Sequence, residues 1–238
     1  YWEVVVQHIL RSIIMFGEYI GADILRLFSL LINGAFTSLK VFFLTLFFGL
    51  PLGLLAAVGR KSSIRWIRGP VSLYILIMRG TPLILQLIFF YFAPSFMLPE
   101  GLRINIDRFS AAVIAFSLNY AAYFAEIYRG GIESIPHGQY EAAAVLGFTR
   151  TQTFFRIILP QVIKRILPPI SNEVITLVKD TALVQVLGIS ELFRVAKNES
   201  SRIFSTTPLF AAGLIYFVMN WMVTKAFQVA EDRLNYYR

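Results

Sequence analysis

The stretch from Val41 to Val58 contains no charged side chain, and it constrains this chain more than any other feature. Two further apolar runs, Val71 to Met78 and Leu83 to Ala93, flank the tetrapeptide Arg79-Gly80-Thr81-Pro82. Only 15% of the 238 residues are charged, whereas soluble domains carry about a quarter. A helix that crosses a bilayer needs about 20 mostly apolar residues. The sequence therefore predicts an all-α integral membrane protein.

The chain is long enough for about five membrane-spanning helices in a single domain over residues 34–238. The expected spans are residues 34–58, 71–93, 109–128, 166–187 and 209–229. In the first span Gly49, Gly53 and Ala57 lie four residues apart, which favours close approach of another helix. Residues 1–33 mix apolar and charged positions at helical spacing. This pattern predicts an amphipathic helix along the membrane surface, with a flexible arm as the alternative.

The distribution of basic residues predicts which connections face the cytoplasm, because Lys and Arg collect on that side of a membrane. The connection 59–69 holds four basic residues and no acidic one, and the long segment 129–165 holds five bases against two acids. Both are expected to be cytoplasmic, with the amino terminus outside and the carboxyl terminus inside. The net charge of +8 therefore needs no nucleic acid as partner. Without cysteine, and with His8 and His137 far apart, no metal centre is expected.

The segment 129–165 has the pattern of a helix, a sharp turn and a second helix. Pro136 suits the first turn of a helix, and the residues that follow are strong helix formers. Gly147 is expected to end that helix, because glycine readily adopts a positive φ. Thr149 can cap the second helix, which should run towards Leu159 and Pro160. The product is a small basic hairpin on the cytoplasmic face, suited to a groove on another protein.

This hairpin resembles the loop of ABC importer permeases, in which EAA is followed by three residues, Gly, nine residues and I-x-L-P. The matching residues here are Glu141, Ala142, Ala143, Gly147, Ile157, Leu159 and Pro160, with Pro136 and Gly138 just before them. The resemblance implies the type I importer permease fold and a coupling helix that enters a cleft of the ATPase subunit. Glu141 would then meet basic residues of the ATPase, and Gly147 would make the turn.

Further motifs resemble the permeases for histidine, arginine, glutamine and cystine. They are RGTP at 79–82 with Gln86, E-x-x-RGGI at 126–132, SIP-x-GQ-x-E at 134–141, LPP at 167–169, KDT at 179–181 and EL at 191–192. The resemblance covers about residues 34–192. It implies a multi-pass protein of the bacterial cytoplasmic membrane that takes up a polar amino acid. The sequence does not name the amino acid.

The chain contains no GxxxxGK[ST] phosphate loop, so it is not expected to bind ATP as that motif does. No catalytic residue and no cofactor is expected on this chain. The resemblance implies a separate ATPase subunit that holds ATP and Mg, an extracytoplasmic amino-acid-binding protein and alternating access. Five spans are few for a pathway, so a dimer is expected, with either a second copy or a homologue.

Charged residues inside spans usually face a cavity or a partner. Candidates for the substrate pathway are Arg79, Thr81, Gln86, Asn119, Tyr123, Glu126, Glu173, Thr176, Lys179 and Asp180. The helical period predicts one face for Asn119, Tyr123 and Glu126, and another for Glu173, Thr176 and Asp180, with Lys179 turned away. Gly80 and Pro82 are expected to break the second span and free backbone groups for a polar ligand.

A zwitterionic amino acid needs acceptors for its ammonium group and donors for its carboxylate. Glu173, Asn119 or Asp180 can serve the ammonium group; Thr176, Arg79 or a backbone amide can serve the carboxylate. In the alternative interpretation the pairs Arg79–Asp180 and Lys179–Glu173 are structural ion pairs, and Glu126 anchors Arg129.

Two other classes of protein fit the sequence less well. An ion-coupled secondary transporter or channel would use the buried charges as a relay, but it has no use for an EAA-type loop. A membrane enzyme is disfavoured because the sequence shows no metal triad, no nucleophile with its base and no phosphate loop.

Overall fold

The structure is a computed structural model that describes residues 2–97 and 99–234, with side chains described from residue 23 onward except at residue 102. The described residues form helices and no strand. The helices are α1 (Trp2–Arg60), α2 (Arg65–Gly80), α3 (Leu83–Phe96), η1 (Glu100–Leu102), α4 (Arg108–Glu133), α5 (His137–Val145), α6 (Arg150–Thr153), η2 (Phe154–Ile158), α7 (Leu159–Asp180), η3 (Thr181–Leu187), α8 (Leu192–Ile203) and α9 (Thr207–Arg233).

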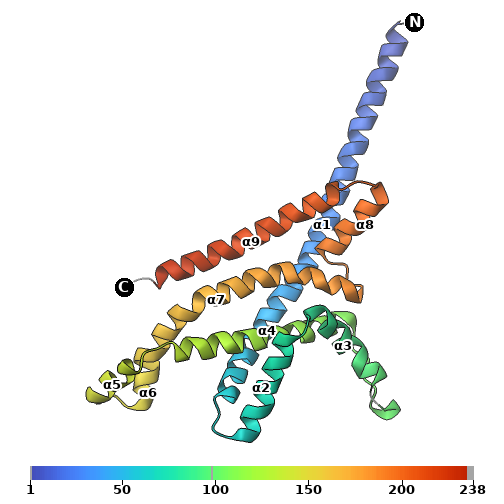
Figure 1. Cartoon of the computed structure of the whole chain (residues 1–238). Coiled ribbons are helices and arrows are strands. Elements are labelled where there is room, and N and C mark those ends of the chain that lie inside the picture. Colours follow the sequence, from blue (N-terminus) through green and yellow to red (C-terminus); the bar gives the residue numbers. More distant parts are fainter. Residues whose placement is uncertain (1, 98, 235–238) are drawn as a thin grey trace.

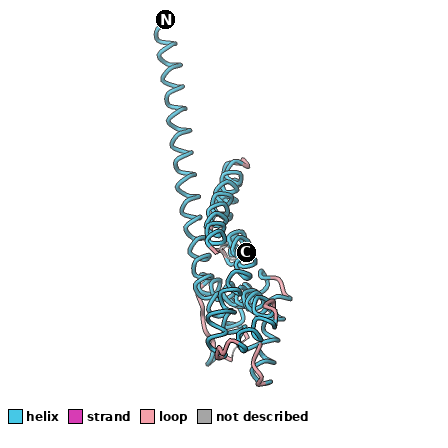
Figure 2. Tube along the Cα trace, turned by 90° about the vertical axis from the view of Figure 1, so that its left-hand side faces the viewer, coloured by secondary structure: helices cyan, strands magenta, loops and turns pink. Residues whose placement is uncertain are grey.

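Helix α1 extends far beyond the other helices at its amino-terminal end, and its lower half packs along α4 (Figures 1 and 2). Residues 23–33 continue the same helix into the first expected span, so no break in secondary structure separates residue 33 from residue 34. The predicted amphipathic character of residues 1–33 falls mainly on residues 1–22, whose side chains lie outside the described part of the chain.

Three described helices are long and apolar enough to cross a membrane: Asp23–Arg60 of α1, α4 and α9. Helices α2 and α3 pass the same test together but are bent by 116° at their junction, which gives up to four spans. These four correspond to the first, second, third and fifth expected spans. The fourth, at 166–187, falls on α7 and η3 and does not pass the test. Helix α7 carries Lys164, Arg165, Glu173, Lys179 and Asp180, so its place as a fifth span stays a prediction.

The contact between α1 and α4 depends on small side chains of α1. A Cβ added to Gly53 would lie 2.7 Å from the Cβ of Phe124 and 3.0 Å from the carbonyl oxygen of Ala121. Ala57, one turn further, is 3% exposed. The prediction of a small-residue face that lets another helix approach closely is therefore confirmed.

A second close approach joins α1 to the start of α8. A Cβ on Gly34 would lie 2.9 Å from the Cα of Leu192 and 3.1 Å from the carbonyl carbon of Glu191. The Glu191 carboxylate is fully buried, accepts hydrogen bonds from the amides of Phe193 and Arg194 and caps α8. Its Oε2 also accepts from the Tyr216 hydroxyl of α9 at 3.0 Å. Glu191 therefore links α8 to α9 by hydrogen bonds, at the point where Gly34 of α1 packs against α8.

We predict that Gly34→Ala destabilises the protein by about 1–3 kcal/mol, because the new methyl group meets backbone atoms that cannot rotate away. The measurement is the midpoint of thermal unfolding in detergent. Gly213→Ala in α9 is the matched control, since no atom lies within 4 Å of a Cβ there. Because alanine favours helix by about 0.5–1 kcal/mol over glycine, the control should be neutral or stabilising. Equal midpoints for the two variants would contradict this close contact.

Candidate functional site

The site begins at the break between α2 and α3. Thr81 and Pro82 adopt extended backbone angles between the two helices. Proline disfavours a helical conformation in the residue before it and has no N–H of its own, so the helix ends at Gly80. The predicted interruption of the second span at Gly80 to Pro82 is therefore confirmed.

Two amide side chains satisfy the carbonyl groups that this break sets free. The Gln86 Nε2 donates to the carbonyl oxygens of Met78 at 2.9 Å and Thr81 at 3.1 Å, and to the Thr81 hydroxyl at 2.8 Å. The Asn119 Nδ2 of α4 donates to the same Met78 oxygen and to the Gln86 Oε1, both at 3.0 Å. Both side chains are buried. The main role of these two side chains is therefore to hold the bend between α2 and α3 in place against α4 by hydrogen bonds.

A hollow of about 350 Å³ lies beside the break, and we call it the central hollow. It is lined by Thr81, Pro82, Leu83, Asn119, Tyr120, Tyr123, Glu173, Thr176 and Asp180. Six of these were among the predicted pathway residues, namely Thr81, Asn119, Tyr123, Glu173, Thr176 and Asp180. Lys179 does not line it, in agreement with the helical period. The structure thus brings together residues from the break, α4 and α7, which lie far apart in the sequence.

The central hollow is acidic. The Asp180 Oδ2 accepts a hydrogen bond of 2.8 Å from the Tyr120 hydroxyl. Glu173 forms no hydrogen bond and no ion pair with any described residue. Neither suggested ion pair, Arg79–Asp180 or Lys179–Glu173, forms among the described side chains, and Arg79 instead pairs with Glu126. Two carboxylates that form no ion pair among the described side chains suit an ammonium group.

Sequence reasoning missed Tyr120. This residue adjoins Asn119, and its ring lies close to that of Tyr123, with 6.2 Å between the ring centroids. The helical period places Asn119 and Tyr123 on one face of α4 and Tyr120 on a neighbouring one. The tyrosine side chain is nevertheless long enough to reach Asp180 of α7. A buried hydroxyl that requires a partner was the available signal.

Glu126 lies further along α4, outside the central hollow, and forms ion pairs with three arginines. Its Oε2 is 2.8 Å from the Arg129 Nη2 and 3.5 Å from the Arg79 Nη1, and its Oε1 contacts Arg60. Arg129 also pairs with Glu133. We call these five residues the Glu126 cluster. The predicted anchoring of Arg129 by Glu126 is confirmed, but the cluster also ties the carboxyl-terminal ends of α1 and α2 to α4.

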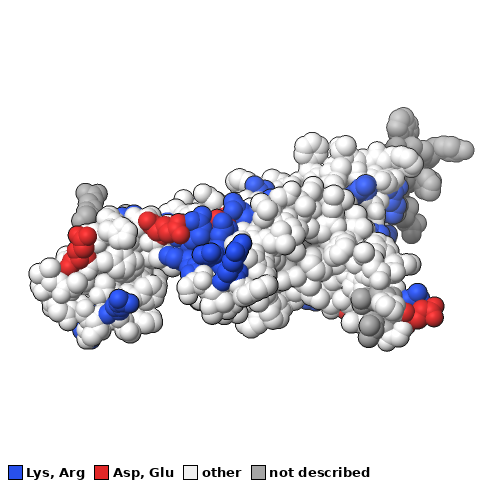
Figure 3. All heavy atoms as spheres, turned by 60° about the horizontal axis from the view of Figure 1, so that its bottom comes forward, with Lys and Arg blue, Asp and Glu red and all other residues white. Residues whose placement is uncertain are grey.

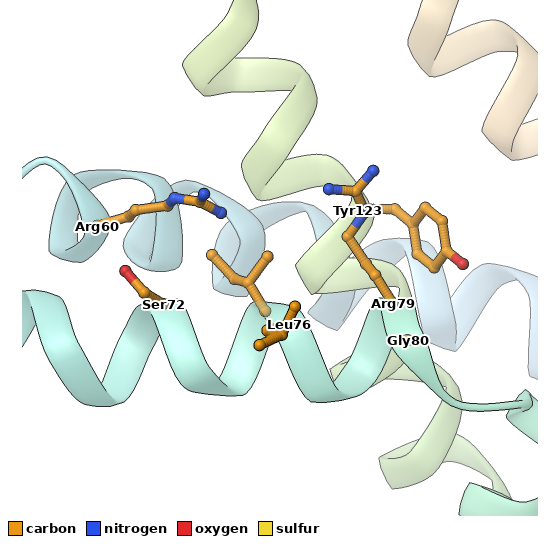
Figure 4. A pocket seen from close by; sticks show the side chains of 7 residues that line it. Arg60, Ser72, Leu76, Arg79, Gly80 and Tyr123 are labelled. Carbon is orange, nitrogen blue, oxygen red and sulfur yellow. The ribbon is translucent and has the colours of Figure 1, made fainter.

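A second hollow of about 540 Å³ adjoins the Glu126 cluster, and we call it the inner hollow. Figure 4 shows Arg60 and Arg79 reaching across it from α1 and α2, with Tyr123 beside Arg79. The Arg79 guanidinium carbon lies 5.4 Å from the centre of the Tyr123 ring. Tyr123 lines both hollows. Arg79 therefore belongs to the inner hollow and not to the central one, where it was proposed as a donor to a carboxylate.

The segment 129–165 forms the expected hairpin. Pro136 precedes α5, and Gly147 ends it with a φ of +77°. The Thr149 hydroxyl accepts from the Gln152 amide while the Gln152 side chain accepts from the Thr149 amide, which is a capping box. The predicted turn at Gly147 and cap at Thr149 are confirmed. Residues 129–133 still belong to α4, so the loop itself is shorter than expected.

The second helix of the hairpin does not stop near Leu159 and Pro160 as expected. It passes through the π-helical turn η2 into α7. Pro160 lies in the first turn of α7, directly after this π-helical turn, where the α-helical hydrogen-bond ladder is already interrupted. The backbone is therefore helical from Arg150 to Asp180 and joins the hairpin to the carboxylates of the central hollow.

The tip of the hairpin exposes large apolar side chains that no described residue covers. Val145 is 88% exposed and Leu146 is 73% exposed, directly before the Gly147 turn. Glu141 and Gly138 are also exposed, and a Cβ on Gly138 would meet no atom of the chain. No contact with a described residue thus requires glycine at position 138. Seen from below, the face of the molecule nearest the α1–α2 connection carries a dense group of basic side chains (Figure 3).

A broken span, carboxylates around a polar hollow and long apolar helices are typical of a membrane transport protein. Residues 49–236 match the family model of the binding-protein-dependent transport system inner membrane component. The chain belongs to this family.

Named relatives agree with this assignment. The chain is 38% identical over 211 residues to the L-cystine transport system permease protein TcyB of Bacillus subtilis (strain 168), which covers 87% of this chain and 88% of that protein. It is also 38% identical over 205 residues to the arginine transport system permease protein ArtQ of the same organism, with 86% and 92% covered.

Two solved structures share the fold. One is described as an amino acid ABC transporter with histidines; its TM-score is 0.80 at 37% identity, with 89% of this chain and 97% of that chain covered. The other is the inward-facing MetNI methionine ABC transporter, with a TM-score of 0.67 at 22% identity and 87% and 97% covered.

We predict that Gln86→Leu destabilises the protein by about 1–3 kcal/mol, because it leaves the carbonyl groups of Met78 and Thr81 short of donors. Thermal unfolding in detergent measures the effect. Gln185→Leu is the matched control, since the Gln185 side chain forms no hydrogen bond with a described residue. If both variants unfold at the same temperature, Gln86 does not support the break.

Proposed function

We propose that this chain is the membrane-spanning permease subunit of an ATP-driven ABC importer for a polar amino acid. The observation that carries the proposal is the central hollow, which is polar, acidic and placed beside a broken helix. The names of the relatives, which include transport systems for cystine, arginine, glutamine and octopine, support the substrate class. The chain is a transport subunit, and ATP hydrolysis belongs to a separate one.

In the proposed binding mode, Glu173 and Asp180 accept hydrogen bonds from the ammonium group of the amino acid. Glu173 is available because no described cation pairs with it. Asn119 uses its amide nitrogen to support the break, which leaves its carbonyl oxygen for the ligand. The Thr81 hydroxyl donates to the carbonyl oxygen of Ile77 and the Thr176 hydroxyl to that of Asn172. In the proposed mode both hydroxyl groups turn to donate to the carboxylate of the ligand. Lys179 and Gln86 take no direct part in this mode.

The inner hollow gives the exit towards the cytoplasm. Tyr123 separates it from the central hollow, and Arg79 stands just behind this ring. Of the three arginines at Glu126, Arg79 makes the longest contact and is 43% exposed. It can therefore turn towards a passing carboxylate while Arg60 and Arg129 keep Glu126 neutralised. Alternating access then requires the Glu126 cluster to open and close.

The hairpin is the proposed docking element for the ATPase, which would hold ATP and Mg. Its exposed apolar tip and the carboxylate of Glu141 suit a groove with basic residues, and the π-helical turn joins it to α7. The basic face in Figure 3 favours the cytoplasmic side for this end of the molecule, with the amino terminus outside and the carboxyl terminus in the cytoplasm. The protein would thus be a multi-pass protein of the bacterial cytoplasmic membrane.

Two further partners complete the proposal. An extracytoplasmic amino-acid-binding protein would deliver the substrate. The second permease, either another copy or a homologue, would cover apolar side chains that this chain leaves exposed, such as Phe89 and Phe96 on α3. The proposed spans remain 34–58, 71–93, 109–128, 166–187 and 209–229, within a single domain of residues 34–238.

The proposed function is tested by gentle affinity purification of the full chain from its native membrane. We expect an ATPase subunit with a phosphate loop in equal amount, detected by mass spectrometry. The purified complex should then gain thermal stability from one or more of L-arginine, L-histidine, L-glutamine and L-cystine, because a ligand of the folded state raises its stability. Absence of both the ATPase and the stabilisation would overturn the proposal.

For the hairpin, we predict that Gly147→Val uncouples ATP hydrolysis from uptake, whereas Gly147→Asn retains much of the coupling. The φ of +77° is strained for a β-branched residue but is tolerated by asparagine. The measurements are ATPase activity and amino-acid uptake in reconstituted vesicles. Both variants should reach the membrane in normal amount, since nothing packs within 4 Å of a Cβ at this position. Equal coupling in the two variants would remove the docking role of the turn.

For the central hollow, we predict that Glu173→Gln weakens amino-acid binding at least about tenfold, because a charged hydrogen bond contributes about 1.5–3 kcal/mol. Titration calorimetry on the purified complex gives the dissociation constant. Glu100→Gln, at an exposed ion pair with Arg103, is the matched control and should bind normally. A variant that binds normally but unfolds at lower temperature would assign Glu173 a structural role instead.

A further inference from the structure

Two arginines from different helices converge on Gly188, at the opposite end of α4 from the hairpin. A Cβ on Gly188 would lie 2.7 Å from the Arg108 Nη1 and 3.2 Å from the Arg194 Nη1. Gly188 has a φ of +82°, so glycine provides both the backbone conformation and the room for the two guanidinium groups. Two like charges are thus held within a few ångströms of one point.

No carboxylate balances these two charges among the described residues. Arg194 donates only to the carbonyl oxygen of Gln185, at 3.2 Å, and Arg108 donates to no described group. The nearby Asp107 carboxylate instead accepts from the amides of Phe109 and Ser110 as the cap of α4. Guanidinium groups brought together without a counter-ion favour an anion, and their planar forks match a carboxylate in two-pronged geometry.

The two arginines line a hollow of about 350 Å³, which we call the outer hollow. Its other principal walls are Tyr91, Phe92, Gln185 and Gly188. The volume equals that of the central hollow. The aromatic side chains of α3 give it an apolar wall, and no acidic residue lines it. It is therefore a place of suitable size and charge for a small molecule that carries a carboxylate.

The outer hollow and the central hollow share the same elements. Helix α3 contributes Leu83 to the central hollow and Tyr91 to the outer one, about 12 Å further along its axis. Asp180 of the central hollow directly precedes η3, which supplies Gln185 to the outer hollow. Along α4 the order is Arg108, then Asn119 and Tyr123, then Glu126. Along α4, the outer hollow thus lies beside the central hollow, on the side away from the hairpin.

We infer that the outer hollow is a binding site for the α-carboxylate of an amino acid on its way to the central hollow. This inference rests on the proposed function and adds an entry site to it. The charges are complementary along the path: Arg108 and Arg194 attract the carboxylate first, and Glu173 and Asp180 then attract the ammonium group. The ligand class is a free zwitterionic amino acid.

Arginine modification in the absence of any binding protein tests the site directly. The full chain with its copurified ATPase is placed in nanodiscs of phosphatidylcholine and treated with phenylglyoxal, and each modified arginine is quantified by mass spectrometry. We expect L-histidine or L-glutamine, which carry no guanidinium group to consume the reagent, to slow modification of Arg108 and Arg194 severalfold. The α-carboxamide of the same amino acid, which lacks the carboxylate, should not protect. Arg103, which pairs with Glu100, is the internal control and should react equally in all samples.

The same measurement separates failure of this inference from failure of the proposed function. If an amino acid stabilises the complex thermally but protects neither arginine, the entry site is wrong and the proposed function stands. If no amino acid stabilises the complex, the substrate class in the proposed function fails first. Protection by added phosphatidylglycerol, and not by an amino acid, would assign the two arginines to a lipid headgroup and overturn the inference.

Substitutions supply an independent readout. R108Q and R194Q should each raise the amino-acid concentration for half-maximal uptake severalfold, and the double variant about tenfold or more, at an unchanged maximal rate. R108K and R194K keep the charge without the planar fork and should be intermediate. R103Q is the matched control and should transport normally. An unchanged half-maximal concentration in a folded double variant would overturn the inference.

Discussion

The break at Thr81 and Pro82 is the constraint on which the rest of the site depends. An interrupted helix leaves carbonyl groups without their helical donors, and other groups must then satisfy them. Gln86 of α3 and Asn119 of α4 supply them, so the same hydrogen bonds that make the bend tolerable also fix α2, α3 and α4 against one another. The bend of 116° then opens the space that becomes the central hollow.

Positive and negative side chains occupy different positions along α4. Arg108 lies at the start of the helix, the central hollow opposite Tyr120 is acidic, and the Glu126 cluster near the end has three arginines against two glutamates. Because the carboxylates of the central hollow form no ion pair with a described arginine or lysine, their charge remains available to a ligand. A structural ion pair at the same position would neutralise that charge. The separation of the two signs is therefore what makes a polar pathway possible in an apolar protein.

Much of this could be predicted from the sequence, because the signals were local. Pro82 fixes its own φ and restricts Thr81, Gly147 alone suits the positive φ of its turn, and helical period groups Glu173, Thr176 and Asp180. Long-range partners could not be predicted. The residues around Arg79 in the sequence do not show whether it pairs with Glu126 or with Asp180, because both carboxylates lie on other helices. Tyr120 and the approach of Gly34 to Leu192 likewise depend on how helices pack, and a sequence pattern does not encode that distance.

The continuous helix from Arg150 to Asp180 gives the hairpin and the central hollow a mechanical connection. A displacement of the hairpin by a docked ATPase would move this helix as a lever, because hydrogen-bonded helices resist bending except at local irregularities. The π-helical turn at Phe154–Ile158 is one such irregularity, next to the hairpin, and Pro168 and Pro169 inside α7 are another, about one turn before Glu173. Beyond both, the last part of α7 would move Glu173 and Asp180 together relative to α4. The hydrogen bond from Tyr120 to Asp180 is the contact that this movement would strain first, so the acidity of the hollow and the docking of the ATPase are linked through one helix.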